Sequence, residues 1–343
     1  MKPVRSKTAA NRHPCPAVAR NIVYKMDSAC QGRLFCYNTH RMTTPFQMPR
    51  VLAWEVTRRC PLNCRHCRAA AANIAYDREL STDECRRVIA SLDHTMVIWT
   101  GGEPMLRADI LELVRLATAQ GLRSVMAPCG MLVTEERLRV LKDAGVMACS
   151  FSLDGPDAAT HDAFRGVNGA YENVTRAMAV ARSIGLPFQV NTTVSTLNLH
   201  QLDAIYARAV ELGASKLDVF FLVPVGRGKG LADHALSDEQ TRSVLDWCFR
   251  KAVEGPLAIK ETCCPSAPAY WSACGSPGPR PSGCLGGRGF AFLSHTGDLQ
   301  TCGFIDTPCG NIRDFDCDFK ALVASAANPL GTIGTCRRQT PST

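Results

Sequence analysis

The sequence predicts an α/β fold, a partial (βα)6 barrel followed by a small cysteine-rich appendage. Between residues 51 and 253, short apolar stretches alternate six times with longer segments of helical periodicity. Strands separated by helices pair in parallel through right-handed crossovers. Six such units fall short of the eight that close a barrel. After about residue 255 the helical periodicity gives way to Cys, Gly and Pro, which predicts the appendage.

Six strand–helix units follow one another along the chain. The expected strands are 51–57, 96–100, 122–127, 147–153, 188–194 and 217–223, and the expected helices are 81–93, 108–120, 134–144, 169–184, 199–212 and 237–253. The first helix has a clear start signal, because Ser81 and Glu84 have the spacing of a capping box. Ligands bind at the carboxyl ends of parallel strands in such folds, so we expect the functional residues there.

The excess positive charge is confined to the N-terminus. The chain has 343 residues and a net charge of +8; residues 1–50 hold nine Lys or Arg and one acid, which accounts for the whole excess. A neutral folded region argues against nucleic acid as a partner. No apolar run approaches the ~18 residues of a membrane helix, and no signal peptide is visible. We expect a poorly ordered basic extension over 1–48, the barrel over 49–255 and the cysteine-rich region over 256–343.

Eighteen cysteines are many for a chain of this length. Without a secretory signal, and with several cysteines at short metal-type spacings, thiolate-bound iron in the reducing cytoplasm is expected rather than a disulfide framework. Cys85, Cys149 and Cys248 fall inside expected helices or strands. These three are predicted to be buried, apolar side chains.

Three cysteines directly follow the first strand. Cys60, Cys64 and Cys67 form a C-x3-C-x2-C motif, in which three thiolates can hold one iron–sulfur cube and leave one iron open to a further ligand. The alternative is a zinc site with His66 as the fourth ligand. Because His66 is adjacent to Cys67, the two side chains are poorly placed to reach one tetrahedral ion.

This motif after a first strand resembles the signature of the radical S-adenosylmethionine superfamily. The resemblance implies that Cys60, Cys64 and Cys67 bind a [4Fe–4S] cluster whose fourth iron is chelated by S-adenosylmethionine. Reduction, by a donor such as ferredoxin or flavodoxin, would then release a 5′-deoxyadenosyl radical that abstracts hydrogen from the substrate. The cofactors carry the chemistry and the protein positions them.

The resemblance extends to the ends of later strands. Gly101, Gly102, Glu103 and Pro104 follow the second strand, one unit after the cysteines, and match the stretch that contacts the amino group of S-adenosylmethionine in the family. Glycines at a strand end also permit close approach of a ligand.

Four further polar residues are implied in binding the cosubstrate. Ser152 and Asp154 at the end of the fourth strand match groups that bind its ribose or carboxylate, although an Asp-Gly turn with a structural serine remains an alternative. Arg165 matches an arginine near the methionine carboxylate, or is a surface arginine. Asn191 on the fifth strand is expected to reach the cosubstrate.

The C-terminal region resembles the auxiliary-cluster module called SPASM. Cys284 and Cys302 enclose a C-x12-G-x4-C pattern, and Cys309 follows. The resemblance implies that these three cysteines, with one further group, hold a possible auxiliary [4Fe–4S] cluster. The later cysteine run of the module is missing, so the end of the chain is interpreted as truncated. Reduced or zinc-bound cysteines are the alternative.

Residues from about 50 to 315 also resemble haem b synthases of the siroheme-dependent alternative haem pathway. The stretches that carry this are 51–60, 67–71, 125–128, 188–193, 222–228 and 283–287. It implies oxidative decarboxylation of two propionates of iron-coproporphyrin III to vinyls, giving haem b, and hence a tetrapyrrole substrate. The basic loop 224–230 suits a carboxylate-bearing substrate or is simply solvated. Related tetrapyrrole- or peptide-modifying enzymes share the core motifs, and an inactive iron–sulfur scaffold is a further alternative.

Overall fold

The computed structural model describes residues 48–275 and 283–326. The expected basic extension, apart from Met48, and the end of the chain with Cys336 lie outside the described residues. In the described residues, no helix combines the length and the apolar character that crossing a membrane requires.

One ten-stranded sheet organises the fold, in the order β10-β9-β8-β1-β2-β3-β4-β5-β6-β7. The strands are β1 (Val51–Thr57), β2 (Met96–Gly101), β3 (Arg123–Met126), β4 (Val146–Ser152), β5 (Phe188–Val194), β6 (Lys216–Phe221), β7 (Ala258–Thr262), β8 (Phe290–Leu293), β9 (Asp298–Gln300) and β10 (Pro308–Asn311). All neighbours from β8 through β1 to β7 pair in parallel, and β9 and β10 add an antiparallel hairpin. The described sheet stays open between β7 and β8, so the barrel is partial.

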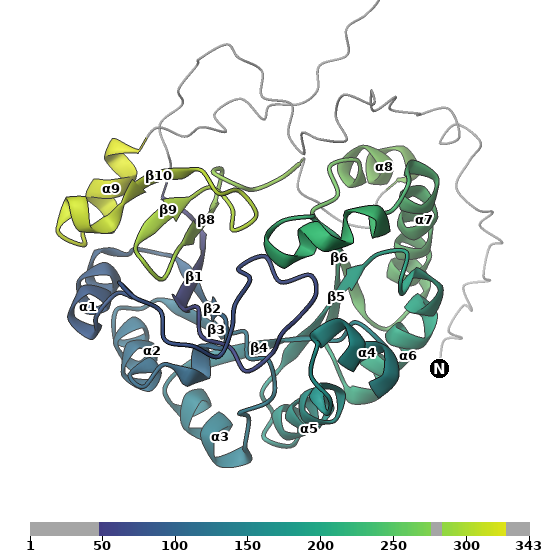
Figure 1. The fold of residues 1–343 in the computed structure, drawn as a ribbon, viewed down its shortest axis with the longest axis horizontal. Helices are drawn as coiled ribbons and strands as arrows, with labels where there is room; N and C mark the ends of the chain where they lie inside the picture. Colours follow the sequence, from purple (N-terminus) through teal and green to yellow (C-terminus); the bar gives the residue numbers. More distant parts are fainter. Residues whose placement is uncertain (1–47, 276–282, 327–343) are drawn as a thin grey trace, which may run out of the picture.

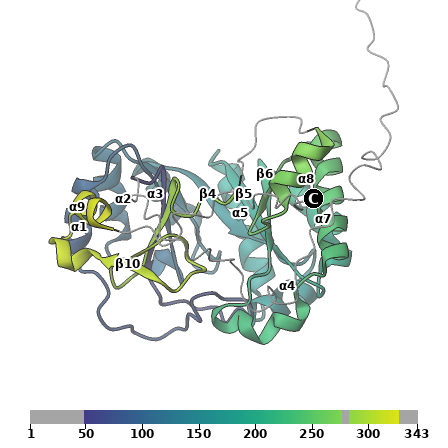
Figure 2. The same cartoon turned by 90° about the horizontal axis from the view of Figure 1, so that it is seen from above.

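The helices cover the outer side of this curved sheet (Figure 1). They are α1 (Thr82–Ser91), α2 (Ile110–Ala119), α3 (Glu135–Asp143), α4 (Ala158–Arg165), α5 (Ala170–Ser183), α6 (Leu202–Leu212), α7 (Asp238–Glu254), α8 (Ala267–Cys274) and α9 (Phe319–Ser325). Short 3-10 turns lie at Pro104–Leu106, Leu199–Gln201, Gly226–His234 and Ile312–Phe315. Figure 2 shows the crescent from above, with α9 beside α1 at one end and α7 and α8 at the other.

The six expected strand–helix units are confirmed to within a few residues at each end. The capping box is also present, because Ser81 Oγ accepts the Glu84 N–H and the Glu84 carboxylate accepts the Ser81 N–H. Elements that the sequence did not predict are α4, α8, α9, β7, β8 and β10. Strands β7 and β8 come from the region expected to be an appendage, yet each pairs with an edge strand of the barrel.

The core lies between the sheet and the outer helices. Trp54 on β1 and Trp99 on β2 are paired in register, are both fully buried, and stack with ring centroids 5.6 Å apart. Cys85, Cys149 and Cys248 are fully buried in this core, as the sequence predicts. Because side chains alternate along a strand, Glu55 lies on the face of β1 opposite to Trp54. That face holds the polar residues described below.

Candidate active site

The C-x3-C-x2-C loop runs from the carboxyl end of β1 across the mouth of the partial barrel. Cys60 and Cys64 are buried, and Cys67 is half-buried. The loop is held by backbone hydrogen bonds: Asn63 N–H donates to the Arg165 carbonyl at 3.1 Å, and Cys60 N–H donates to the Ala72 carbonyl at 3.0 Å. The polypeptide therefore fixes the path of the loop.

Arg227 holds the loop from the β6 side. Its Nε donates to the Cys64 carbonyl at 2.9 Å, its Nη1 to the Ala71 carbonyl at 2.7 Å, and its backbone N–H to the Cys67 carbonyl at 3.0 Å. The basic loop 224–230 was offered as a substrate-carboxylate contact. In the structure, Arg227 of this loop donates these three hydrogen bonds to carbonyl groups of the cysteine loop.

A buried group of charges stands beside Cys64. Asp154 is fully buried; its Oδ2 lies 2.6 Å from Arg165 Nη2, and its Oδ1 accepts the Thr193 N–H at 2.8 Å. Arg165 Nη1 also lies 3.7 Å from Cys64 Sγ. Burial acts to raise the pKa of Asp154, but Arg165, together with His66, His161 and the Thr193 N–H, holds that pKa below its usual range. The structure thus brings Asp154 and Arg165, both predicted site residues, next to the cysteines.

His66 faces this group rather than a tetrahedral ion. Its Nε2 lies 3.8 Å from Asp154 Oδ2, and its ring packs against Phe164. Burial lowers the pKa of His66 to about 4, so the ring is neutral near pH 7.

The Gly101–Pro104 stretch closes the site on the β2 side. The N–H groups of Gly102 and Glu103 donate to the carbonyls of Thr57 and Arg59, each at 2.8 Å. A Cβ at Gly102 would lie 2.3 Å from the Arg59 carbonyl oxygen. The close approach of two segments of this chain is therefore sufficient to require a glycine at position 102.

Glu103 is fully buried and shapes the turn through its side chain. Its Oε1 accepts the Met105 N–H at 2.9 Å and its Oε2 accepts the Cys129 N–H at 2.6 Å. Burial raises the pKa of Glu103.

Cys129, after β3, is a site residue that sequence reasoning missed. Its thiol hydrogen-bonds with that of Cys60, and it packs on the cluster of Cys60, Leu62 and Cys64. The hydrogen bond from Cys129 lowers the pKa of Cys60 despite burial. Its position just after the carboxyl end of the expected strand 122–127 could have identified Cys129 as a site residue.

Ser152 and Asn191 lie side by side at the ends of β4 and β5. They are register partners and are both half-buried. Asn191 Oδ1 accepts a hydrogen bond from Gln189 Nε2 at 2.8 Å. The two predicted residues are therefore brought together on strands that neighbour Asp154.

These residues fit an iron–sulfur cluster with a bound cosubstrate. Three buried nitrogen atoms beside the cysteines have no hydrogen-bond partner among the described residues, namely Arg165 Nε, Arg227 Nη2 and His66 Nδ1. Buried polar groups are normally satisfied, so these orphans mark the place of a polar ligand. Within the described ranges no three Cys, His, Asp or Glu side chains converge on one metal ion. Thiolates that bind different irons of a cube need not converge.

A second group of thiols lies around β7, β8 and β9. Cys263 directly follows β7, and Cys284 and Cys302 flank β8 and β9. Burial raises the pKa of Cys263, and the nearby thiols of Cys302 and Cys284 act in the same direction. Cys309 lies on β10 and packs on the main core, where burial raises its pKa to about 11. Cys263 was not predicted from the sequence. Its position directly after a strand would have indicated it, but strand β7 was itself not predicted.

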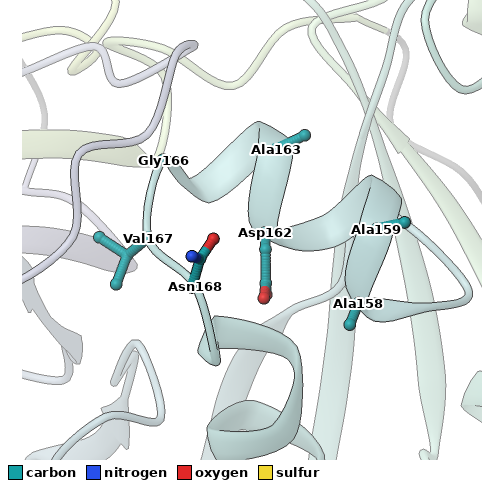
Figure 3. A pocket seen from close by; sticks show the side chains of 7 residues that line it. All are labelled: Ala158, Ala159, Asp162, Ala163, Gly166, Val167 and Asn168. Atoms are coloured by element: carbon teal, nitrogen blue, oxygen red, sulfur yellow. The ribbon is translucent and has the colours of Figure 1, made fainter.

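A surface hollow of about 450 Å³ runs along α4 and the loop that follows it (Figure 3). Its one charged residue, Asp162, accepts the N–H groups of Gly169 and Tyr171, both at 2.7 Å. Asp162 therefore caps the start of α5, and the hollow offers no unpaired charge to a ligand.

Comparison with known proteins agrees with this geometry. The model of the radical SAM superfamily matches residues 54–209. An AdoMet-dependent heme synthase of Nitratidesulfovibrio vulgaris is 42% identical over 283 residues, which cover 77% of this chain and 76% of that protein. An AdoMet-dependent heme synthase of Methanosarcina barkeri is 39% identical over 284 residues, covering 78% and 80%.

The fold matches solved structures as well. The native enzyme anSMEcpe with bound AdoMet superposes with a TM-score of 0.63 at 17% identity, covering 79% of each chain. Membership of the superfamily implies a [4Fe–4S] cluster and S-adenosylmethionine as cofactors. The cysteine loop, the partial barrel and the relatives agree, and the chain belongs to the radical SAM superfamily, in the family that contains the AdoMet-dependent heme synthases.

Proposed function

We propose that this chain is a haem b synthase that converts two propionates of iron-coproporphyrin III into vinyl groups. The observation that carries the proposal is the 42% identity to an AdoMet-dependent heme synthase over 77% of the chain, well beyond the superfamily core. Each propionate loses a hydrogen atom from its β-carbon, its carboxylate as carbon dioxide, and one electron. Two propionates therefore need two turnovers.

The cluster and S-adenosylmethionine, when bound, supply the radical that removes this hydrogen atom. Cys60, Cys64 and Cys67 hold the cluster. Gly101, Gly102, Glu103 and Pro104 form the turn beside the cosubstrate's amino group, and Glu103 acts by fixing the turn, since its two oxygens accept N–H groups of Met105 and Cys129. Ser152, Asn191, Asp154 and Arg165 form the opposite wall. Arg165 supplies positive charge to a carboxylate there and to Cys64.

The electron released in each turnover needs an acceptor. We assign an auxiliary cluster to Cys284 and Cys302, and add Cys263 as a third ligand because its thiol lies near both. Cys309 remains a candidate for the fourth position. Burial raises the pKa of Cys302, while the Phe304 N–H and the charge of Arg68 act against it. A ferredoxin or flavodoxin in the cytoplasm fits as the donor for the first cluster, and neither nucleic acid nor membrane is proposed as a partner.

The proposal is tested anaerobically with protein reconstituted with iron and sulfide. S-adenosylmethionine, dithionite and iron-coproporphyrin III are added, and porphyrin and nucleoside are followed by mass spectrometry. Stepwise loss of two carboxyl groups, with one 5′-deoxyadenosine per step, supports the synthase. 5′-Deoxyadenosine with unchanged porphyrin, even with an added electron acceptor, rejects this substrate and favours another tetrapyrrole or a peptide. Absence of both products favours an inactive scaffold.

A further inference from the structure

Arg68 stands next to Cys67, yet its side chain turns away from solvent. The side chain is 19% exposed. Its Nη2 lies 3.1 Å from Glu55 Oε2, and its guanidinium carbon lies 4.2 Å from the centre of the Phe292 ring. A carboxylate on one edge and an aromatic face together fix the plane of this guanidinium.

The charges around Glu55 do not balance. Glu55 is fully buried on β1, and Arg58 donates to its Oε1 through Nε at 3.1 Å and Nη2 at 3.0 Å, while His295 Nδ1 lies 2.7 Å from the same oxygen. One carboxylate thus faces two guanidinium groups. Even with His295 neutral, one positive charge is left over. Because Arg58 donates two hydrogen bonds to Oε1, Arg68 is the less well paired of the two cations, and such a charge attracts an anion.

Arg68 also has hydrogen-bond donors to spare. Glu55 Oε2 is its ion-pair partner among the described residues, but that oxygen accepts no hydrogen bond, so the N–H groups of Arg68 have no hydrogen-bond acceptor there. Residue 303 beside it is glycine, and a Cβ there would lie 3.1 Å from Arg68 Nε. The backbone of residue 303 therefore packs closely on the Nε side, and a ligand would approach the Nη1 and Nη2 end of the guanidinium. A planar guanidinium with a free edge matches a carboxylate.

Arg68 lies close to both groups of thiols, the one around Cys67 and the one around Cys302. It is bonded in sequence to Cys67 of the first group, and its charge acts on Cys302 of the second. A carboxylate held on Arg68 would keep the attached molecule between the place where the radical forms and the place assigned to the electron acceptor.

We propose that the free edge of Arg68 binds a propionate carboxylate of the substrate, which makes Arg68 a specificity-determining residue for carboxylate-bearing tetrapyrroles. The inference rests on the proposed function. It gives Arg68 a role that was expected of the basic loop 224–230, where Arg227 uses Nε and Nη1 on carbonyls and has only Nη2, a buried atom, without a partner among the described residues.

The test is an equilibrium titration of reconstituted protein with iron-coproporphyrin III, followed by the shift of the porphyrin absorbance, without reductant. Arg68→Gln should raise the Kd about 10- to 100-fold, because a charge-assisted hydrogen bond to a carboxylate is lost. The Kd of Arg68→Lys should lie between those of the unchanged protein and Arg68→Gln. Arg59→Gln removes the same charge from the same loop, where Arg59 binds only Asn73 Oδ1 among the described side chains, and should bind as the unchanged protein does.

A second ligand separates charge recognition from packing. The tetramethyl ester of iron-coproporphyrin III has no carboxylate, so Arg68→Gln should not weaken its binding further. Iron content and the visible spectrum of the cluster show that each variant is intact. Equal Kd values for Arg68→Gln and the unchanged protein overturn the inference alone, as does an equal loss with acid and ester. Failure of the unchanged protein to bind the porphyrin overturns the proposed function together with it.

Discussion

Arg165 Nη2 lies 2.6 Å from Asp154 Oδ2, and this contact aims the rest of the guanidinium at the cysteine loop. Its Nη1 reaches to 3.7 Å from Cys64 Sγ. Burial acts to lower the pKa of Arg165, but Asp154 and Cys64 hold it above its usual value, so the cation persists. The contact arises because α4 ends at Arg165, beside the loop.

Replacing Arg165 should change the cluster itself. A cation that donates to a ligand sulfur stabilises the more negative, reduced cluster. Arg165→Gln should therefore lower the midpoint potential, on the order of tens of millivolts, and Arg165→Lys should lower it less. The measurement is a redox titration followed by electron paramagnetic resonance without S-adenosylmethionine. Arg208→Gln on α6 is the control. An unchanged potential with weaker S-adenosylmethionine binding would show that Arg165 serves the cosubstrate alone.

The auxiliary site should depend on Cys263. With Cys60, Cys64 and Cys67 all replaced by alanine, any iron that remains belongs to the second thiol group. Adding Cys263→Ala should remove about four iron ions per chain, measured by iron and sulfide analysis after anaerobic reconstitution. Cys248→Ala, which alters a fully buried core thiol, controls for general loss of structure. Retention of iron by the Cys263 variant, with loss in Cys309→Ala, would assign the site to Cys309 instead.

Gly102 should tolerate no side chain. The added methyl group of Gly102→Ala would meet the carbonyls of Arg58 and Arg59, 2.4 and 2.3 Å away, and would push the cysteine loop from the β2 end. We expect S-adenosylmethionine to bind at least about tenfold more weakly, as measured by isothermal titration calorimetry. Gly230→Ala, where nothing lies within 4 Å of the added atom, is the matched control. Equal affinities for both variants would contradict the close-approach argument.

Glu55 should stabilise the fold above pH 5 and lose this effect in acid. Burial acts to raise its pKa, but His295, Arg68 and Arg58 together lower it from 4.5 to about 2. A group with a lowered folded-state pKa contributes stability above its unfolded pKa and loses it as pH falls through the folded one. The contribution, on the order of 3 kcal/mol, should disappear between about pH 4.5 and 2.

Urea unfolding across this pH range measures the effect. Glu55→Gln should be less stable at pH 7, and its free energy of unfolding should fall less steeply below pH 4.5. Glu254→Gln, at an exposed position on α7, should keep the full pH dependence. A Glu55→Gln protein with the same acid dependence as the unchanged chain would show that other carboxylates carry it.

The sequence predicted what local patterns determine. Apolar periodicity located six strands and six helices, and the spacing of Cys60, Cys64 and Cys67 located the cluster loop. Strand β7 was missed because Ala258–Thr262 is short and places two apolar residues before two charged ones, without the alternation of a strand. Strand β8 was missed because Phe290–Leu293 is a short apolar run among glycines. Both gain their stability from pairing with β6 and β1, which no local pattern reports.

The same limit applies to the site. Asp154 and Arg165 were named from the resemblance, but their mutual contact depends on the short helix α4, which was not expected. Glu55 sits in an apolar strand, where one carboxylate gives no sign of the two guanidinium groups that converge on it from Arg58 and Arg68. Cys263 was passed over because its partners are distant in the chain and become neighbours only through the curvature of the sheet.

That curvature has a consequence for how the protein matures. Strands β7 and β8 are the two borders of the parallel crescent, and Cys263 leaves one border while Cys284 and Cys302 flank the other. Iron bound by these thiols would crosslink β7 and β8, which do not pair with each other. Metal that binds only the folded chain adds its binding free energy to the stability of the fold. Iron supply would then govern the rigidity of the barrel mouth as well as electron transfer, so that an iron-starved cell would hold a looser, more protease-sensitive form of the protein.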